Sequence, residues 1–325
     1  MAARILLTHS PAARANYYGD KALAGLRAMG DVVLNEDDFS LEGNELIAAA
    51  ADCDLVVSFR QSPAPAELFE RLPKLSAFLR CAIDIRNVDV AAASRAGVLV
   101  TQASAGFVAS MAEMLFGFMI DLSRGITAYA SAYHAGRPPK AATGRELRGA
   151  TLGVIGCGAI GREVVRLGRA FGMKVLIADP YAKGVKTVPL QDLLFQSDYV
   201  LPLAVATEET ENLIGEKEFG AMKRGAFFIN ASRGNLVDEA ALARALDSGR
   251  IAGCALDVGR APDQMPAPAL AARAGVIATP HIGGLTVPAI EHQALETVAQ
   301  AAEILQGRAP KGAVNAEHWK RKPKP

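Results

Sequence analysis

The stretch GVIGCGAIG, residues 153–161, places glycines at positions 156, 158 and 161. It overlaps the end of the strand-like run TLGVI and opens the run AIGREVVRLGRAFG, whose apolar residues recur with the helical period. In such a strand–loop–helix unit, Gly156 permits the tight turn, Gly158 lets a pyrophosphate approach the backbone, and Gly161 lets the helix pack on the strand. The unpaired N–H groups of the helix N-terminus would then bind the phosphates. The stretch therefore predicts a dinucleotide-binding α/β unit.

An acidic residue at the end of the next strand-like run, KVLIADP, indicates which dinucleotide is bound. Asp179 lies 18 residues after Gly161, close to the spacing at which a carboxylate accepts hydrogen bonds from the adenosine ribose. A carboxylate there would repel a 2′-phosphate, and no arginine follows it directly, because the next residues are Pro180 and Tyr181. We therefore expect NAD rather than NADP as the cofactor.

The glycine loop lies near the middle of the 325-residue chain, so a separate domain is expected before it. The first hundred residues alternate strand-like runs with amphipathic helical stretches. The early strand-like runs are RILLTH (4–9), DVVLN (31–35), DLVVSF (54–59), SAFLRC (76–81) and VLVT (98–101). After the glycine loop, similar runs lie at 198–203, 225–232, 252–258 and 275–279. This rhythm predicts an α/β fold with two doubly wound parallel sheets.

A long helical stretch, residues 109–136, separates the two series and ends at RPPK (137–140). Its apolar residues cover most of the helix circumference. We expect one helix that is buried on two sides, against its own domain and against another surface such as a second subunit.

The composition is that of an ordinary globular protein: half the residues are hydrophobic, 21% are charged, and the formal net charge is +1. This charge gives no reason to expect a nucleic acid or an anionic membrane as a partner. The longest apolar run, MLFGFMI (114–120), is too short to cross a bilayer. The four cysteines show neither a C-x-x-C pair nor metal-ligand spacing, so we expect buried, reduced thiols, a cytoplasmic protein and no metal. The basic end KRKPKP (320–325) is expected to be a solvated tail.

Three predicted strand ends in the second half carry reactive side chains. Arg233 follows the run FFINAS, Asp257 ends the run GCALD, and His281 follows VIATP. In doubly wound sheets, working residues lie at the carboxyl ends of the strands, so these side chains are expected at one edge of the sheet.

Together, the segments GRELRGATLGVIGCGAIG, MKRGAFFINASRGNLVDEAALARALDSGRIAGCALDV and ATPHIGG resemble the D-isomer-specific 2-hydroxyacid dehydrogenase family. The resemblance covers roughly residues 50–310. It implies a Rossmann NAD domain, residues 103–286, inserted into a flavodoxin-like substrate domain formed by residues 1–102 and 287–325. It also implies a homodimeric enzyme that uses NAD to interconvert a 2-oxo acid and a D-2-hydroxy acid.

The resemblance also implies roles for individual residues. Arg233 would grip the substrate carboxylate and 2-oxo oxygen, since a guanidinium forks to a carboxylate and stabilises a developing oxyanion. His281 would donate the proton to the carbonyl oxygen, because imidazole exchanges protons near neutral pH. The residues expected to contact the cofactor are Gly156, Gly158, Ala159, Ile160, Gly161, Asp179, Thr207, Ala231, Ser232, Asp257 and Gly283.

In the first half, AIDIRN (82–87) falls where the family's glycine-rich loop offers N–H groups to the substrate carboxylate, which makes Ile83 and Asp84 candidate substrate residues. The family usually has glycine at Asp84 and aspartate at Arg86. We expect Asp84 to turn toward Arg86, the alternative being a pocket adapted to a substrate with an additional donor group. Arg60 would either contact a larger or anionic substrate tail or lie in solvent. The particular 2-oxo acid stays unassigned.

The family's acid that orients the histidine has no direct counterpart. Counted from Asp257, its position falls on Pro262. Counted back from His281, DQMP (263–266) overlays the family's Glu-Pro-Leu-Pro, with Asp263 as the acid after one inserted residue. Because aspartate is one methylene shorter than glutamate, the extra residue could restore its reach. Asp263 is therefore a candidate partner of His281, the alternative being that it faces solvent.

Two other functions are compatible with the same motifs. The family's C-terminal-binding-protein corepressors show that this fold can act as an NADH-sensing binding protein, and turnover of any 2-oxo acid would separate the two cases. Oxidation of formate or phosphite would keep the chemistry and change the substrate.

Overall fold

The computed structural model describes residues 2–261 and 264–323, and the chain divides into two compact units. Unit 1 comprises residues 1–107 and 285–325, and unit 2 comprises residues 108–284. These boundaries lie five and two residues from the predicted ones. The first shift arises because Ser104 is bonded to unit 1: its N–H and its hydroxyl donate to Glu296 at 2.7 and 2.8 Å.

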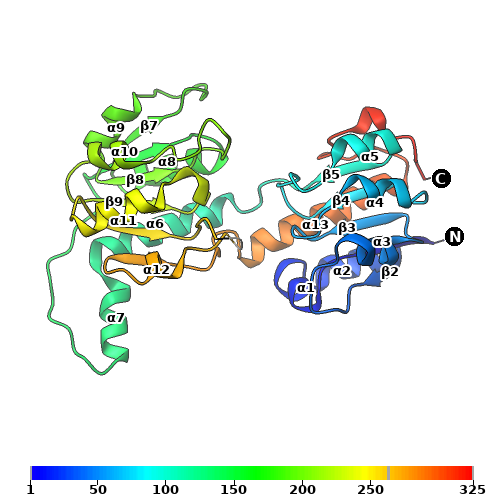
Figure 1. Cartoon of the computed structure of the whole chain (residues 1–325), viewed down its shortest axis with the longest axis horizontal. Coiled ribbons are helices and arrows are strands. Elements are labelled where there is room, and N and C mark those ends of the chain that lie inside the picture. The colour runs from blue at the N-terminus through cyan, green and yellow to red at the C-terminus, as the bar shows by residue number, and fades with distance from the viewer. Residues whose placement is uncertain (1, 262–263, 324–325) are drawn as a thin grey trace. The chain divides into compact units, whose positions relative to one another are not determined.

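Unit 1 is built on a parallel sheet in the order β2-β1-β3-β4-β5 (Figure 1). Its strands are β1 (Ala3–Leu7), β2 (Gly30–Leu34), β3 (Leu55–Ser58), β4 (Ala77–Arg80) and β5 (Leu99–Gln102). Its helices are α1 (Pro11–Tyr17), α2 (Asp20–Arg27), α3 (Gly43–Ala50), α4 (Ala66–Arg71), α5 (Val90–Ala96), α13 (Val287–Leu305) and the 3-10 turn η2 (Ala316–His318). This strand order is the flavodoxin-like one, with the switch point at β1.

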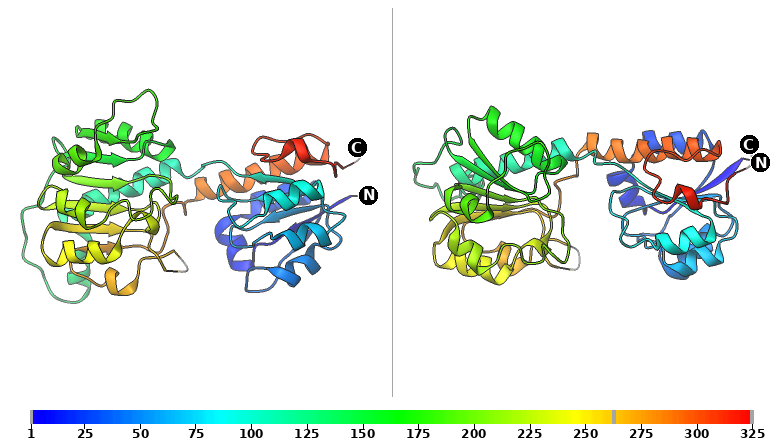
Figure 2. Two further views of the ribbon diagram at one scale, coloured as in Figure 1. Left: turned by 45° about the horizontal axis from the view of Figure 1, so that its top comes forward. Right: turned by 90° about the horizontal axis from the view of Figure 1, so that it is seen from above.

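Alternate residues of the central strands of unit 1 supply two cores, one on each face of the sheet. Leu6 packs with buried residues of α3, α4 and α5, whereas its neighbours Ile5 and Leu7 pack with α2 and α13. The right view of Figure 2 shows α13, in orange, together with the dark-blue helices on one face of this sheet, and the lighter blue and cyan helices on the other. The near-continuous hydrophobic strands of the sequence are explained by this burial on both sides.

The end of the chain is part of unit 1 rather than the solvated tail expected from its composition. The indole N–H of Trp319 donates to the carbonyl of Ser76 at 3.1 Å. The backbone N–H groups of Lys320 and Arg321 both donate to the carbonyl of Gly97 at 3.0 Å. The expectation was wrong for the backbone of Lys320 and Arg321, which is bonded to unit 1 next to the buried Trp319, although Lys320 is itself exposed.

Unit 2 is built on a parallel sheet in the order β11-β10-β9-β8-β6-β7. Its strands are β6 (Thr151–Ile155), β7 (Lys174–Ala178), β8 (Tyr199–Pro202), β9 (Ala226–Asn230), β10 (Ile251–Leu256) and β11 (Val276–Ala278). Its helices are α6 (Val108–Arg124), α7 (Ile126–His134), α8 (Ala159–Ala170), α9 (Leu190–Gln196), α10 (Glu216–Ala221), α11 (Glu239–Asp247), α12 (Pro268–Ala271) and the 3-10 turn η1 (Gly234–Leu236). The chain leaves β6 for β7 on one side and returns to β8 on the other, which puts the switch point at the end of β6.

The long helix expected over residues 109–136 is two helices. Gly125, with φ +67°, ends α6, and α7 follows it. Seven residues of α6 are buried, but none of α7 is, and Figure 1 shows α7 extending away from the sheet of unit 2. The apolar pattern alone did not reveal the break, because it depends on the left-handed backbone that glycine permits.

Candidate active site

The three glycines of the loop after β6 have three different surroundings. Gly156 has φ +95°, and a Cβ at this position would lie 2.6 Å from the amide nitrogen of Ala204 in the loop after β8. A Cβ on Gly161 would lie 2.3 Å from the carbonyl oxygen of Gly156, so only glycine lets α8 approach the strand. A Cβ on Gly158 would meet no atom within 4 Å. The space above Gly158 is therefore open to a ligand, whereas the other two glycines are required by the fold.

The N-terminus of α8 has the properties of an anion site. Gly158 is its N-cap residue, no side chain caps the helix, and the first turn, with Ala159 and Ile160, contains no acidic residue. The N–H groups of this turn and the positive end of the helix dipole are thus available to a phosphate. With the open space above Gly158, this end of α8 fits the pyrophosphate of a dinucleotide.

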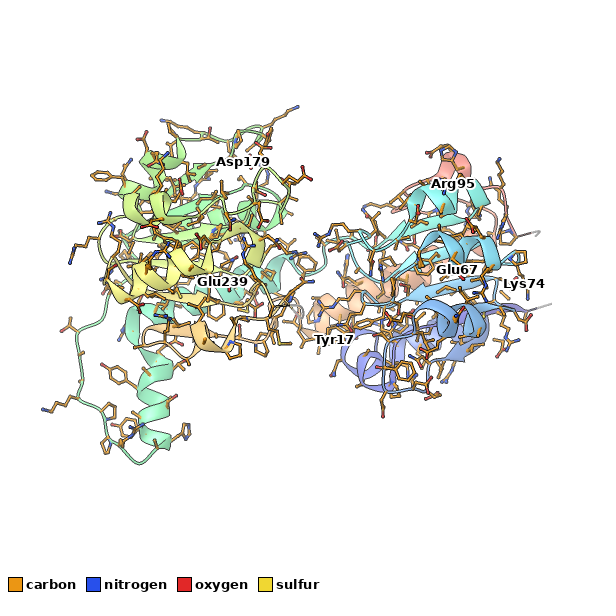
Figure 3. All side chains as sticks on the ribbon, in the orientation of Figure 1. Tyr17, Glu67, Lys74, Arg95, Asp179 and Glu239 are labelled. Carbon is orange, nitrogen blue, oxygen red and sulfur yellow. The ribbon has the colours of Figure 1, made fainter. Side chains whose placement is uncertain are left out.

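Asp179 follows β7 directly and is fixed beside this loop. Its Oδ2 accepts the N–H of Cys157 at 2.7 Å, and its Oδ1 accepts the N–H of Tyr181 at 2.8 Å. Each carboxylate oxygen keeps a lone pair for a ribose hydroxyl. The hydroxyl of Tyr181 donates to both carboxylate oxygens of Glu209 at 2.9 Å, which places a second acid in the loop facing this one. Figure 3 labels Asp179 in unit 2.

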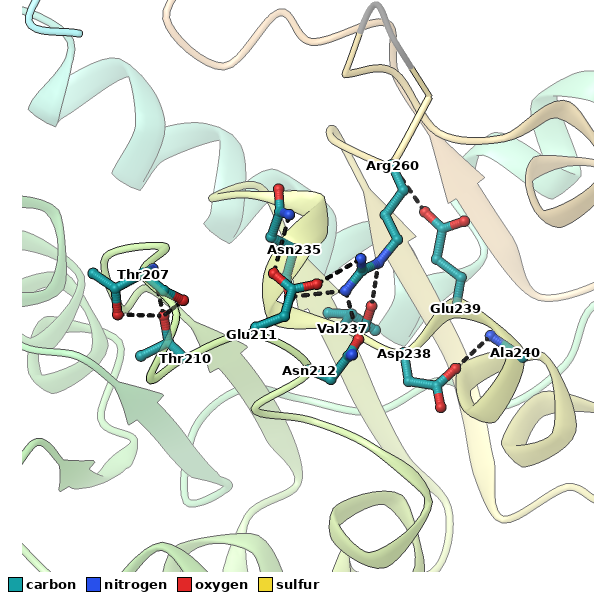
Figure 4. A network of polar contacts seen from close by, with 10 residues as sticks. All are labelled: Thr207, Thr210, Glu211, Asn212, Asn235, Val237, Asp238, Glu239, Ala240 and Arg260. Carbon is teal, nitrogen blue, oxygen red and sulfur yellow. Dashed lines mark hydrogen bonds and ion pairs between the residues drawn. The ribbon is translucent and has the colours of Figure 1, made fainter. Parts of the chain in front are cut away.

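The loop after β8 carries Thr207 and is organised by Thr210 (Figure 4). The Thr210 hydroxyl donates to the carbonyl of Val205 at 2.6 Å and accepts the N–H of Thr207 at 2.8 Å. Thr207 itself is exposed, so its side chain is accessible to a ligand.

The loop after β9 is shaped by Asn230, the last residue of the strand. Its buried amide donates to the carbonyl of Arg233 at 2.9 Å and accepts the N–H of Ser232 at 3.0 Å. The Ser232 hydroxyl lies 3.3 Å from the carbonyl of Ala204, which joins this loop to the one after β8. Ala231 is buried, and Arg233 is half-buried with one guanidinium N–H donating to the carbonyl of Ser232 at 2.7 Å.

Asp257 and His281 are brought together at the ends of β10 and β11. Asp257 is fully buried, and its Oδ1 accepts the Thr279 hydroxyl at 2.6 Å and the N–H of Ile282 at 2.8 Å. Its Oδ2 accepts the N–H of Gly283 at 2.8 Å. His281 lies in the loop that these three hydrogen bonds hold to Asp257. It is half-buried and has φ +56°.

The side chain of Arg260, in the loop after β10, links this loop to the loops after β8 and β9 (Figure 4). The guanidinium of Arg260 donates to Glu211 at 2.7 Å, and its Nε donates to the carbonyl of Val237 at 2.9 Å. The guanidinium also donates to the side chain of Asn212 and the carbonyl of Asn235, and the backbone N–H of Arg260 donates to Glu239 at 2.9 Å. A Cβ on Gly234 would lie 2.2 Å from the carbonyl of Gly259, so the two loops also meet through their backbones. Arg260 is therefore committed to holding these loops together.

The candidate residues of unit 1 lie after β3 and β4. The guanidinium of Arg86 bonds Asp84 at 2.6 Å, and this hydrogen bond raises the pKa of Arg86. The expected pairing of these two residues is thus present. Arg60 is exposed and its guanidinium lies 5.4 Å from the ring centre of Tyr17, which Figure 3 labels in α1. Ile83, which precedes Asp84 in the sequence, is half-buried.

The structure thus groups the predicted residues into two sets, each at the carboxyl edge of the sheet of its own unit. Asp263 lies outside the described residues. Sequence reasoning missed Asn230, Thr210, Thr279 and Arg260. Asn230 could have been found as a strand-end asparagine that makes an Asx turn. Arg260 has no local signal, since its side-chain partners lie 23 to 49 residues away.

Comparison with known proteins identifies unit 2 as an NAD-binding domain. A model of the NAD-binding domain of D-isomer-specific 2-hydroxyacid dehydrogenases matches residues 116–283. A glyoxylate reductase of Korarchaeum cryptofilum is 31% identical over 316 residues, which cover 94% of this chain and 95% of that protein. A D-3-phosphoglycerate dehydrogenase of Rattus norvegicus is 34% identical over 287 residues, which cover 86% of this chain and 54% of that protein. This chain therefore spans about half the length of that second relative.

Solved structures show the same two-unit fold. A D-2-hydroxyisocaproate dehydrogenase superposes with a TM-score of 0.86 at 25% identity, covering 96% of this chain and 99% of that one. The D-lactate dehydrogenase of Escherichia coli superposes with a TM-score of 0.83 at 25% identity, over 96% and 99% of the two chains. These similarities confirm the predicted fold class, the predicted use of NAD and the predicted reaction class. They support a dehydrogenase rather than the alternative, a binding protein without turnover. The chain belongs to the D-isomer-specific 2-hydroxyacid dehydrogenase family, whose members are NAD-dependent enzymes that act on the CH–OH group of their substrates.

Proposed function

We propose that this chain reduces a small 2-oxo acid to its D-2-hydroxy acid, with Arg233 and His281 acting on the substrate at the carboxyl edge of unit 2. The observation that carries the proposal is the network that joins the glycine loop, the Arg233 loop and the His281 loop along this edge. Contacts of Gly156 and Ser232 with the loop after β8 link the first two. Gly234 and the Asp257 loop link the last two.

The cofactor supplies the hydride when it is bound. Gly158 and the N-terminus of α8 would hold its pyrophosphate, Asp179 its adenosine ribose, and Thr207, Asp257 and Gly283 its remaining length. A Cβ on Gly283 would lie 2.3 Å from the sulfur of Met111 and 3.0 Å from Asp257, so a larger residue there would require these side chains to shift.

Within the proposed site, Arg233 orients the substrate through its carboxylate and stabilises negative charge on the carbonyl oxygen. His281 delivers the proton to that oxygen, so the protonated imidazole is the active form for reduction. We further propose Asp263 as the acid that keeps this imidazole protonated and oriented. Unit 1 is the proposed substrate domain, in which Arg60, Ile83 and Asp84 would contact the rest of the 2-oxo acid.

A panel of 2-oxo acids from glyoxylate to bulky aryl pyruvates, assayed with NADH at neutral pH, tests the proposal. We expect turnover of at least one small member and a product of D configuration, established by chiral chromatography. Arg233→Lys should raise the KM for the 2-oxo acid more than tenfold, because the ammonium loses the bidentate geometry. Binding of NADH without turnover of any panel member would contradict the proposal.

We also propose a cytoplasmic homodimer. All four cysteines are buried free thiols, and burial raises the pKa of Cys81 and Cys254 to about 12. Buried reduced thiols are typical of a reducing compartment. No helix in the part of the chain that the structure describes has both the length and the hydrophobicity needed to cross a bilayer.

The dimer proposal rests on the exposed side chains of α7. Ile126 is 52% exposed and Tyr133 is 65% exposed, and no residue of α7 is buried within unit 2. Large apolar side chains left exposed on a helix with no buried residue are typical of an interface. Light scattering should give twice the 34.1 kDa of one chain, and a single-chain mass at micromolar concentration would contradict this part of the proposal.

A further inference from the structure

The loop that carries His281 is held by one carboxylate at its centre. Asp257 has no exposed surface, and three donors from the segment 279–283 converge on its two oxygens. Two of these donors are backbone N–H groups, at Ile282 and Gly283. The third is the hydroxyl of Thr279, and it is the only side chain among them.

Thr279 is fixed at both of its ends. Its N–H donates to the carbonyl of Leu256 at 3.0 Å, which continues the pairing of β10 with β11. Its carbonyl accepts the N–H of His281 at 3.0 Å, which closes a tight turn over Pro280. Together with the hydroxyl bond to Asp257, this places Thr279 between the sheet, the carboxylate and the histidine.

The backbone of His281 has φ +56°, a left-handed region that non-glycine residues rarely enter. Such a conformation persists where the surrounding contacts determine it, and the bonds made by Asp257 and Thr279 are among those contacts. Loss of one of them would let the turn relax toward the ordinary backbone region. The imidazole would then leave the direction in which the turn now points it.

We infer that Thr279 is a positioning residue, which acts through Asp257 to hold His281 in the conformation for proton transfer. The inference rests on the proposed role of His281 as proton donor. Thr279 itself is assigned to neither substrate nor cofactor, but its partner Asp257 is proposed to contact the cofactor, so NADH affinity has to be measured apart from the rate. Valine has nearly the shape of threonine and lacks the hydroxyl, and it therefore tests the single hydrogen bond at 2.6 Å.

The test is a double-mutant cycle on the full chain with NADH and a 2-oxo acid that the panel shows to be turned over. The variants are Thr279→Val, Thr279→Ser, His281→Gln and the double variant Thr279→Val/His281→Gln. NADH affinity is measured separately by quenching of cofactor fluorescence, and folding by thermal melting. Thr127→Val is the matched control, since the Thr127 hydroxyl also donates to an aspartate of unit 2, Asp121.

We expect Thr279→Val to lower kcat by roughly ten- to a hundredfold, the effect typical of losing an orienting partner. NADH affinity should change by less than about threefold, and Thr279→Ser should recover most of the rate because it restores the donor. In the His281→Gln background, Thr279→Val should lower kcat by no more than about twofold.

Each outcome decides a different point. An equal loss of rate in both backgrounds, or no loss in either, would overturn the positioning role of Thr279. A loss matched by Thr127→Val would also overturn it, because it would follow from the loss of any threonine–aspartate bond. If His281→Gln alone left kcat and its pH profile unchanged, the proposed proton donor would be wrong and the inference would fall with it. If Thr279→Val does not fold, Thr279→Ala and Thr279→Ser bracket the same bond, and the cycle is run with Thr279→Ala.

Discussion

His9 makes the stability of unit 1 dependent on pH between neutrality and mild acid. It follows β1 at the switch point of that sheet and has no exposed surface. Its ring centre lies 5.0 Å from those of Tyr18 and Phe59, and neither ring nitrogen has a hydrogen-bond partner among the described residues. Burial, and then the cations Arg14 and Arg80, lower its pKa to about 3.

The sign and size of the effect follow from this pKa. The ordinary value for histidine is about 6.5, so below that pH the unfolded chain binds a proton that the folded unit excludes until about pH 3. The stabilisation is therefore complete above pH 6.5 and is lost progressively as the pH falls toward 3. Between pH 7 and pH 5, His9 alone should reduce the free energy of unfolding of unit 1 by about 2 kcal/mol.

The assay compares the wild type with His9→Phe in urea at pH 7 and pH 5. Phenylalanine keeps an aromatic ring beside Tyr18 and Phe59 and takes up no proton. The chain has one tryptophan, Trp319, which is 5% exposed in unit 1, so its fluorescence follows the unfolding of that unit. His134→Gln, in α7 of unit 2, is the control for losing a histidine elsewhere.

We expect the wild type to lose about 2 kcal/mol more than His9→Phe between the two pH values, since all other titrating groups are common to both proteins. The control should behave as the wild type does. An equal loss in the wild type and in His9→Phe would refute the reasoning, because it would show that His9 is not excluded from protonation in the folded unit.

Five other substitutions have distinct expected outcomes. Gly158→Ala should weaken NADH binding at least tenfold and leave the melting temperature unchanged. Gly161→Ala should lower the free energy of unfolding by about 2 kcal/mol, because its Cβ would lie 2.3 Å from a backbone atom. Cofactor titration and calorimetry distinguish the two effects. Asp179→Ala should narrow a preference for NADH over NADPH that we expect to be at least tenfold in kcat/KM, and an unchanged ratio would exclude Asp179 as its cause. Arg260→Met should cost unit 2 about 2 kcal/mol, measured by urea unfolding, because several loop acceptors lose a charged donor; an unaltered midpoint would contradict this. Asp263→Asn should shift the pH profile for reduction to lower pH and reduce kcat roughly ten- to a hundredfold, while an unchanged profile would leave His281 without this partner.

The fold was predictable from the sequence because each strand of both sheets is a short hydrophobic run and each connection has the helical period. The glycine loop and Asp179 were predictable for a related reason: their spacing along the chain is fixed by one strand, one turn and one helix. The break at Gly125 was not, because a single glycine between two apolar helical stretches does not reveal its backbone angle.

The residues that hold the loops of the candidate site were harder to predict from the sequence. Thr279 stands next to the proline of ATPHIGG, but its partner Asp257 lies 22 residues earlier on another strand. Arg260 reaches Glu211 across 49 residues, and only the parallel arrangement of β8, β9 and β10 brings them together. Side chains that we propose to contact the ligands follow local motifs, whereas those that hold the loops depend on tertiary contacts.

The interrupted course of unit 1 along the chain has a consequence for its synthesis. One of its two cores needs Ala294, Ala301, Ile304 and Trp319, all of which are encoded after unit 2. At a typical translation rate, the roughly 180 residues between the two parts of unit 1 take about ten to forty seconds to emerge from the ribosome. During that interval, one hydrophobic face of the nascent sheet of unit 1 has α2 but lacks α13 and Trp319, while unit 2 has all the residues it needs to fold. The newly made N-terminal segment is therefore a natural client for chaperones, and a ribosome that stalls before Val287 leaves that face open to aggregation.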